Sequence, residues 1–325
     1  MSDLIVTKPD FLSKKLKMPY NLRRFDRHES RYYFEIEDRR TTNGDEIIHP
    51  YISITSLADK LIPGGKQLDR WRAALGKDAE SYMVERAVFG TLFHHLAFLP
   101  LTGKSKVHKH GFDFDWLRYR GRGKKHTNFE LLIEPEWRWA ASKWEWSFTR
   151  GLLAWFEFVK ETVKDVLAIE VTLRSKDGYA ATLDFVHTAE YYGKDHLCIT
   201  DIKSFLYEAE ETKTKSFYDV HEFQLEGCKN IWNENFPELP VTQVYNWSPT
   251  QWRKSPGWKW KNQTKNQFAD VTVLGDRTYT AFELLVEYAK TKRLNKPPSR
   301  IIHVGGKIED IRSFNWKNHI KELNL

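Results

Sequence analysis

The fold is decided by the stretch GYAATLDFVHT at residues 178–188 and by LCITDIKS at residues 197–204. Both stretches are rich in apolar residues and threonine, and the turn sequence YGKD lies between them, so they predict a hairpin of two strands. Because side chains two apart on a strand point to the same side, Asp201 and Lys203 share one face of the second strand. Asp184 is the one acid of the first stretch, and the hairpin brings it near them.

Two carboxylates beside a lysine have the chemistry that metal-assisted phosphodiester cleavage needs. Carboxylate oxygens are ligands of hard divalent cations, and an ammonium group can position water or offset charge on a phosphate. The alternative interpretations are a surface acid for Asp184 and an ordinary exposed ion pair for Asp201 and Lys203. The apolar neighbours Leu183 and Phe185 favour a site, because a buried carboxylate needs a cation or hydrogen-bond donors.

Helical and extended patterns alternate through the rest of the chain. We expect a short helix capped by Ser53 or Thr55, and further helices at residues 67–75, 78–99, 134–163, 216–235 and 280–292. We expect strands at residues 166–174, 179–189, 197–204 and 239–247, and a loop rich in Trp and Lys at residues 248–267. This order predicts an α/β fold in which a central mixed sheet is flanked by helices, with a helical N-terminal layer.

The same patterns divide the chain into three regions. Residues 1–50 are polar and irregular, and we expect a loosely packed lead-in that can hold a hairpin. Residues 51–270 form the core, which includes a basic, glycine-punctuated connection at residues 103–126. Residues 271–325 form a C-terminal extension that we expect to pack on the core, and this region can also bind a protein partner.

Composition narrows the class of protein. The chain has 325 residues and only two cysteines, so a disulfide framework or an iron–sulfur cluster held by cysteines is not expected. The first residues lack the apolar run of a signal peptide, and no uncharged stretch is long enough to span a bilayer. We therefore expect no membrane partner and a cytoplasmic or other intracellular location, which includes the host cytoplasm for a viral protein. The net charge of +7 leans toward polyanionic partners.

Four short motifs follow one another between residues 90 and 235. They are GTLFH at residues 90–94 in an expected helix, GYAATLD at residues 178–184, DIK at residues 201–203, and Gln224 in a later expected helix. In this order they resemble the RecB-like exonuclease branch of the PD-(D/E)XK nuclease superfamily, and in particular the mitochondrial genome maintenance exonuclease and its phage relatives. The resemblance implies a restriction-endonuclease-like core, and it does not extend to either end of the chain.

The resemblance also implies a set of site residues. One or two Mg²⁺ or Mn²⁺ ions would be held by His94, Asp184, Asp201 and the backbone carbonyl of Ile202. The implied catalytic residues are Asp184, Asp201, Lys203 and Gln224. Lys203 would position water or stabilise charge, and Gln224 would orient the substrate.

Each of these residues also has a simpler interpretation. His94 could be a buried core histidine, although His95 lies nearer the apolar stripe of the same helix and suits that role better. Gln224 could make a purely structural hydrogen bond to a strand end. Some relatives carry an acid at the place of Glu170, but we expect it to be a solvent-facing strand residue. The family often has an acid where this chain has Phe98, and a tyrosine where it has Cys228.

Two segments have the composition of a nucleic-acid path. In residues 103–126 the candidate phosphate-binding residues are Arg118, Arg120, Arg122, Lys124 and Lys125. In residues 247–265 aromatic and basic residues alternate, which suits stacking of unpaired bases, and the candidates are Trp252, Arg253, Lys254, Trp258, Lys259 and Trp260. The alternatives are a solvated loop for the first segment and core packing of the tryptophans for the second.

The function that these features favour is hydrolysis of DNA. We expect a metal-dependent exonuclease that acts on single-stranded DNA or DNA ends in replication, recombination or genome maintenance, of the phage type. A structure-specific or flap endonuclease is one alternative. A DNA-binding or assembly factor that keeps the nuclease fold with little activity is another, although the presence of Asp184, Asp201 and Lys203 argues against it. A zinc enzyme built on His108, His110 and His126 is disfavoured, because these residues lie in a basic segment.

Overall fold

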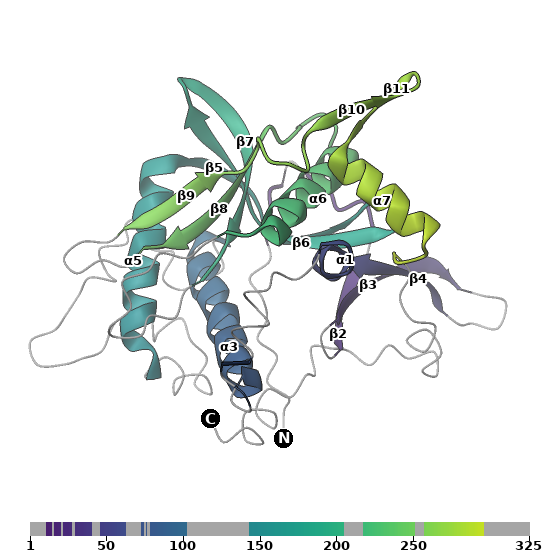
Figure 1. Cartoon of the computed structure of the whole chain (residues 1–325). Helices are drawn as coiled ribbons and strands as arrows, with labels where there is room; N and C mark the ends of the chain where they lie inside the picture. The colour runs from purple at the N-terminus through teal and green to yellow at the C-terminus, as the bar shows by residue number, and fades with distance from the viewer. Residues whose placement is uncertain are drawn as a thin grey trace, which may run out of the picture.

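The computed structural model describes residues 11–14, 16–20, 22–27, 30–40, 46–62, 73–74, 76, 79–102, 143–204, 217–250 and 257–295. Most of the described strands form one nine-stranded sheet, with helices on both sides (Figure 1). Its strands are β1 (Phe11–Leu12), β2 (Leu22–Arg27), β3 (Ser30–Arg40), β4 (Glu46–Ser53), β5 (Val163–Arg174), β6 (Tyr179–Tyr191), β7 (Lys194–Ile202), β8 (Gln243–Pro249) and β9 (Trp258–Asn262). The chain is therefore a mixed α/β protein with a central sheet flanked by helices, as the sequence predicts.

The sheet is mixed in direction. Strands β5, β6 and β7 form the antiparallel meander expected from the sequence, and β8 runs parallel to β7. The start of β6 pairs in parallel with β4, whereas its end pairs with β7 on the same edge. This sharing of one edge joins the N-terminal strands β2, β3 and β4 to the meander in a single sheet.

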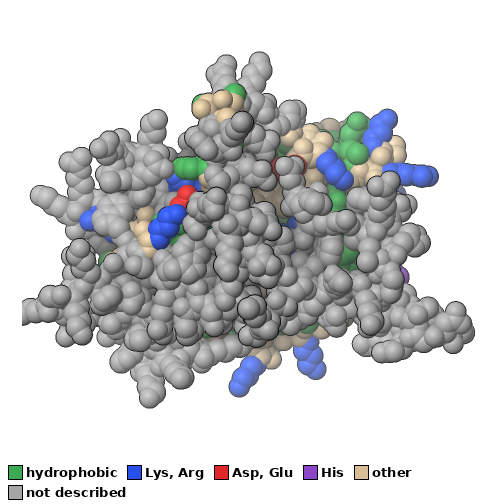
Figure 2. Space-filling model, turned by 90° about the horizontal axis from the view of Figure 1, so that it is seen from below, with side chains coloured by type: hydrophobic (Ala, Val, Ile, Leu, Met, Phe, Trp, Pro, Cys, Tyr) green, Lys and Arg blue, Asp and Glu red, His purple; other side chains and the backbone are tan. Residues whose placement is uncertain are grey.

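The described helices are α1 (Ile54–Leu61), α3 (Ala79–Phe98), α5 (Glu145–Thr162), α6 (Asp219–Asn235) and α7 (Ala281–Thr291), and a 3-10 turn, η2 (Leu99–Thr102), follows α3. Helix α1 begins as predicted, because the Ser53 side chain accepts a hydrogen bond from the Ser56 N–H. None of the described helices combines the length and hydrophobicity needed to cross a bilayer. On the face shown in Figure 2, the described Lys and Arg side chains stand in separate places.

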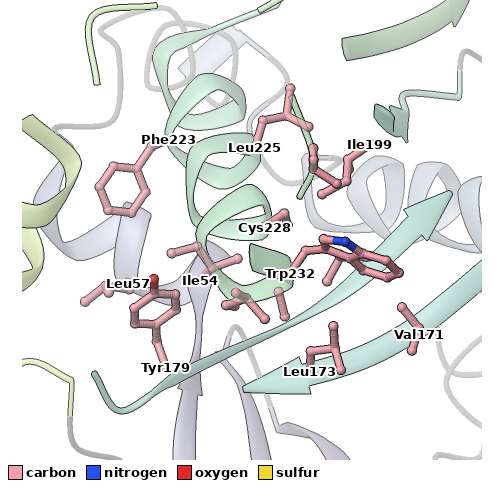
Figure 3. Packing of buried hydrophobic residues seen from close by; sticks show 14 of the residues in the cluster. Ile54, Leu57, Val171, Leu173, Tyr179, Ile199, Phe223, Leu225, Cys228 and Trp232 are labelled. Atoms are coloured by element: carbon pink, nitrogen blue, oxygen red, sulfur yellow. The ribbon is translucent and has the colours of Figure 1, made fainter. Parts of the chain in front are cut away.

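Two hydrophobic clusters fill the space on either side of the sheet. The α3–α5 cluster contains Phe93, Trp155 and Phe158 with the strand residues Phe185 and Trp247. The α6–α7 cluster is built on the opposite side, where α6 directs Cys228 and Trp232 toward residues such as Val171 and Leu173 (Figure 3). Burial of apolar area in these two clusters is the main favourable term that holds the helices to the sheet.

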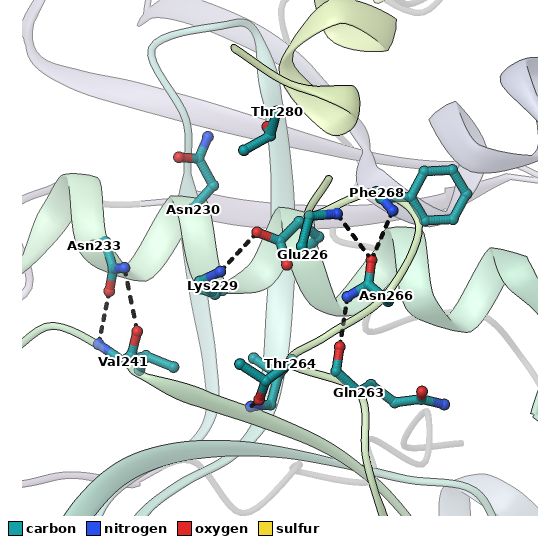
Figure 4. A network of polar contacts seen from close by, with 12 residues as sticks. Glu226, Lys229, Asn230, Asn233, Val241, Gln263, Thr264, Asn266, Phe268 and Thr280 are labelled. Atoms are coloured by element: carbon teal, nitrogen blue, oxygen red, sulfur yellow. Dashed lines mark hydrogen bonds and ion pairs between the residues drawn. The ribbon is translucent and has the colours of Figure 1, made fainter. Parts of the chain in front are cut away.

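A polar network fixes the segment after β9 beneath α6 (Figure 4). The Asn266 amide donates to the Gln263 carbonyl and its oxygen accepts from the Phe268 N–H. On α6 itself the Lys229 ammonium lies 2.8 Å from a carboxylate oxygen of Glu226. These contacts hold the segment that leads toward α7, and Phe282 of α7 packs on Phe223 of α6.

Two expectations about local structure are wrong. Residues 248–267 were expected to be a loop, but they contain β9, which pairs with β8 from Trp258 to Asn262. Residues 1–50 were expected to be loosely packed, yet β3 belongs to the main sheet and its residues Tyr32, Tyr33 and Phe34 are buried. In β9 the alternation of Trp and Lys hides the strand, because only alternate residues face the core. In β3 the charged residues on either side of Tyr32, Tyr33 and Phe34 mask a short buried segment. The expected helix at residues 67–75 lies almost wholly outside the described residues.

The C-terminal part of the described chain adds a small second sheet. Strands β10 (Val271–Leu274) and β11 (Arg277–Thr280) form a hairpin that leads into α7 (Figure 1). Thr280 caps α7 and forms a capping box with Glu283. Helix α7 then packs Phe282, Val286 and Ala289 into the α6–α7 cluster.

Candidate active site

Three side chains from three different elements meet at the middle of the meander. His94 comes from α3, Glu170 from β5 and Asp184 from β6. Nδ1 of His94 lies 3.1 Å from Oε1 of Glu170 and 3.8 Å from Oδ2 of Asp184. One potential ligand atom from each residue lies within 4.8 Å of the other two. We refer to these three residues as the ligand cluster.

The ligand cluster lies where the two hydrophobic clusters adjoin. Ile169 and Phe185 are paired across β5 and β6 and belong to the α3–α5 cluster. The next pair along, Val171 and Leu183, belongs to the α6–α7 cluster. Residues two apart on a regular strand should face the same side, so both strands change face between these pairs. Glu170 and Asp184 lie between these two pairs, where the strands change face. Their side chains can therefore be enclosed by protein and still point toward one another.

The backbone of Glu170 explains this change on β5. Its φ angle is +48°, in the left-handed region that residues other than glycine seldom adopt. Such a conformation costs on the order of 1–3 kcal/mol and is found preferentially at functional sites. The expectation that Glu170 faces solvent is therefore wrong: its side chain is only 2% exposed and contacts His94. Sequence alternation missed it because the alternation itself is interrupted at this residue.

Acceptor oxygens lie near both ring nitrogens of His94, and a neutral imidazole can donate to only one of them. Nδ1 contacts the Glu170 carboxylate at 3.1 Å, and Nε2 lies 3.0 Å from the backbone carbonyl oxygen of Ile202. Phe98, one turn later, meets the imidazole edge-on with ring centroids 5.8 Å apart. An aromatic ring thus covers this edge of the His94 imidazole. His95 is the buried histidine of the helix, as its place near the apolar stripe predicts.

A second polar group lies beside the first and consists of Asp201, Lys203 and Gln224, which we call the lysine cluster. Nζ of Lys203 is 2.6 Å from Oδ2 of Asp201. The Gln224 amide donates to Oδ1 of Asp201 at 2.9 Å, and its oxygen accepts from Lys203 at 3.2 Å. Gln224 on α6 therefore closes a ring of three side chains, and its role in orienting a substrate stays a prediction.

The two clusters are joined through the backbone of β7. The N–H of Ile202 donates to Oδ2 of Asp184 at 2.9 Å, so one peptide separates the Asp184 carboxylate from Asp201. Burial raises the pKa of Asp184 to about 6; His94 and Lys203 oppose the shift, while Asp201 and Glu170 add to it. Asp184 is thus a carboxylate that the protein by itself stabilises poorly.

The charges of the ligand cluster suit a divalent cation. Two carboxylates and one imidazole offer ligand atoms within 4.8 Å of one another, whereas the Ile202 carbonyl lies at the other ring nitrogen of His94, Nε2. Oxygen and imidazole donors without thiolate are the set that Mg²⁺ and Mn²⁺ accept. Asp201 is not part of this group of three, because its carboxylate is engaged by Lys203 and Gln224. That Asp184 and Asp201 hold one ion together stays a prediction.

A steric constraint accounts for glycine at position 90, the first residue of the GTLFH motif. Gly90 lies on α3 one turn before His94, where an added Cβ would stand 3.2 Å from the side-chain oxygen of Ser204. Such a contact is tighter than a methyl group normally tolerates. Gly90 therefore lets α3 approach the end of β7, and this close approach carries His94 to the Ile202 carbonyl.

The residues predicted to bind nucleic acid fall into two groups. Outside the described residues lie Arg118, Arg120, Arg122, Lys124, Lys125, Trp252, Arg253 and Lys254. Trp258, Lys259 and Trp260 lie on β9. The Trp260 ring stacks on Tyr245 with centroids 3.8 Å apart, and both tryptophans contact Phe158 of α5. Trp258 and Trp260 thus pack against the core, which was the alternative interpretation to base stacking. Base stacking by these tryptophans stays a prediction.

Comparison of the sequence with protein-family models and with curated proteins gave no match. The chemistry of the site therefore has to be judged from its own residues.

Proposed function

We propose that this protein is a metal-dependent nuclease with a restriction-endonuclease-like core of the PD-(D/E)XK type, and that it hydrolyses phosphodiester bonds of DNA as a RecB-like exonuclease. The observation that carries the proposal is the adjacency of two partly buried polar clusters of different charge. The ligand cluster places two carboxylates beside one imidazole, and the lysine cluster places an ammonium next to it. A binding site for a cation thus lies beside a group that can stabilise a phosphate.

The fit of a cation to these residues supports the proposal. His94, Glu170 and Asp184 would hold Mg²⁺ or Mn²⁺, and Asp201 is one peptide away from Asp184. When bound, such an ion polarises a phosphate and lowers the pKa of a bound water. The carboxylates need a cation for an electrostatic reason as well, since buried like charges without a counter-ion are costly.

The roles of the remaining residues follow from their contacts. Lys203 has the one ammonium in the lysine cluster, and its side chain is 16% exposed, so it is open to a phosphate oxygen. Asp201 and Gln224 fix its position from two sides. An ammonium held in place before the reaction stabilises developing charge without a cost of reorganisation. Gln224 thereby links α6 to the reacting group.

The proposed substrate is DNA, as single strands or ends, in replication, recombination or genome maintenance. The test is a gel assay with DNA labelled at the 5′ or the 3′ end, single- or double-stranded, in Mg²⁺, Mn²⁺, Ca²⁺ or EDTA. Asp201→Asn serves as the variant with an almost unchanged shape. We expect stepwise shortening in Mg²⁺ or Mn²⁺, and none in EDTA or in the variant.

Other outcomes would redirect the proposal. Internal fragments from flaps or junctions would make the protein an endonuclease, and shortening of RNA alone would change the substrate. Cleavage that persists in EDTA would contradict the role of the ligand cluster. Tight DNA binding without cleavage in any metal would leave a binding factor on a nuclease fold.

A further inference from the structure

Strand β9 presents two chemically different faces. Trp258 and Trp260 point to the α5 side, where both contact Phe158. Lys259 points to the other side, because its ammonium lies 5.0 Å above the Phe217 ring, just before α6. Lys261 faces the same side, since it is close enough to Glu222 of α6 to oppose the rise in that carboxyl's pKa that burial causes. The alternation of Trp and Lys in WKWKN thus separates core packing from a pair of lysines.

The lysine pair lies in line with the candidate active site. In the registered pairs of β7, β8 and β9, Asp201 is opposite Asn246, and Asn246 is opposite Lys261. In the next row, Ser248 is opposite Lys259, and the Lys203 N–H donates to the Trp247 carbonyl beside Ser248. Two rows therefore cross the sheet from the lysine cluster to β9.

The middle of these rows is polar although it is buried. Asn246 is completely buried, and neither atom of its side-chain amide has a hydrogen-bond partner in the part of the chain that the structure describes. Ser248 is buried beside it. A buried amide without partners costs free energy, so an apolar residue would be the stable choice if β8 only carried the core. Polar side chains thus continue from Asp201 on β7 and Lys203 just after it, across Asn246 and Ser248 of β8, to the lysines of β9.

From this arrangement we propose that Lys259 and Lys261 form a second phosphate-binding position, which holds a polynucleotide strand one or more phosphates away from the bond that is cleaved. The inference rests on the proposed nuclease function for its choice of substrate. Adjacent strands lie about 4.8 Å apart, so β9 lies roughly 10 Å from β7, a distance that a single phosphate group does not bridge. The site therefore selects a chain of phosphates over a mononucleotide.

The experiment measures binding and not cleavage. A fluorescent oligothymidylate is titrated with protein in Ca²⁺ over a series of KCl concentrations, and binding is followed by anisotropy. For wild type and the double variant Lys259→Gln/Lys261→Gln, the logarithm of affinity is plotted against the logarithm of salt concentration. Loss of two phosphate contacts should make this slope shallower by about 1.4. Glutamine keeps much of the length of each side chain, so the contact with Phe217 is not left empty.

A charge-matched control separates this site from general attraction. Lys176 and Lys194 are both exposed and lie outside the two rows, and Lys176→Gln/Lys194→Gln removes the same charge. We expect the control to keep the wild-type slope within error. Inorganic phosphate and thymidine monophosphate at an equal concentration of phosphate should displace little of the oligonucleotide, since neither spans both positions.

The outcomes for this position and for the nuclease are distinct. Equal slopes for the two double variants, or efficient displacement by inorganic phosphate, would overturn the second phosphate position while leaving cleavage untouched. A shallower slope for the β9 variant in a protein that never cleaves would support the position and remove the nuclease. A wild-type chain that binds no oligonucleotide would overturn both.

Discussion

The ligand cluster and the lysine cluster lie side by side, but they differ in how their charge is balanced. In the lysine cluster the carboxylate of Asp201 is matched by the ammonium of Lys203, and an amide satisfies both. In the ligand cluster Glu170 and Asp184 carry two negative charges against one imidazole. The charges of the lysine cluster therefore balance within the protein, whereas the ligand cluster has more negative than positive charge.

The difference shows where a cation is needed. A buried ion pair with additional hydrogen bonds persists without help, whereas two carboxylates close together raise each other's pKa. The pKa of Asp184 is raised to about 6, mainly by burial, and the neighbouring carboxylates of Asp201 and Glu170 add to the rise. A metal ion would therefore be bound by the ligand cluster, and the lysine cluster would meet the substrate.

The largest effect is expected from Lys203→Met. Removal of the ammonium takes away a preorganised positive charge, and we expect cleavage to fall by about 10²- to 10³-fold in single-turnover assays. Lys229→Met is the matched control, because Lys229 has a comparable ion pair with the buried Glu226 on α6. Similar losses in both variants would mean that Lys203 serves the fold and not the reaction.

Glu170→Gln should weaken the ligand cluster without emptying it. The variant keeps the shape of the side chain but removes one negative charge, so we expect metal affinity to fall about 10- to 100-fold, by analogy with changes around other metal sites. Mn²⁺ binding by calorimetry or electron paramagnetic resonance measures this. Glu190→Gln is the control, because Glu190 on β6 is exposed and paired with Lys164. Unchanged Mn²⁺ affinity in Glu170→Gln would show that Glu170 only orients His94.

The pH dependence of stability should reveal the cost of burying the Asp184 carboxylate. Its folded pKa of about 6 is above the ordinary value of 3.8, so the native state binds more protons between these values and loses stability as the pH rises. In EDTA, the advantage of Asp184→Asn over wild type in unfolding free energy should therefore grow from pH 4 to pH 7, by on the order of 2 kcal/mol.

Denaturant unfolding at several pH values checks this sign. Saturating Ca²⁺ should reverse the order of the two proteins, because only wild type gains binding free energy from the full set of ligands. An advantage of the variant that shrinks as the pH rises would mean that Asp184 is well compensated within the protein.

The smallest effect is expected from Gln224→Ala. Lys203 and Asp201 retain their ion pair without the amide, so we expect a loss in cleavage rate of only about 3- to 10-fold, or roughly 1 kcal/mol, the value of one hydrogen bond. Comparison with Asn233→Ala, which removes hydrogen bonds to Val241 farther along α6, separates the local effect from loss of helix docking. A loss as large as that of Lys203→Met would make Gln224 an equal member of the reacting group.

Much of the fold was predictable because its elements have local signals. The meander, the helix that carries His94 and the Ser53 cap follow from periodicity and turn chemistry, and the structure confirms each of them. The hairpin allowed for in residues 1–50 is present as β2 and β3, but its place in the main sheet was not predicted, and neither was β9, because charged residues mask the buried ones. The segment WKWKN looks polar until its pairing with β8 is known.

The sequence by itself determined which residue types lie on which elements: an acid on one strand, an acid and a lysine on the next, and a histidine and a glutamine on helices. Only the tertiary structure decided how they are grouped. It turned Glu170 inward through a left-handed φ, paired Asp201 with Lys203, and separated the tryptophans of β9 from its lysines. The local pattern of apolar and polar residues determines where helices and strands form. A strained backbone angle and contacts between distant segments depend on the packing of the whole chain.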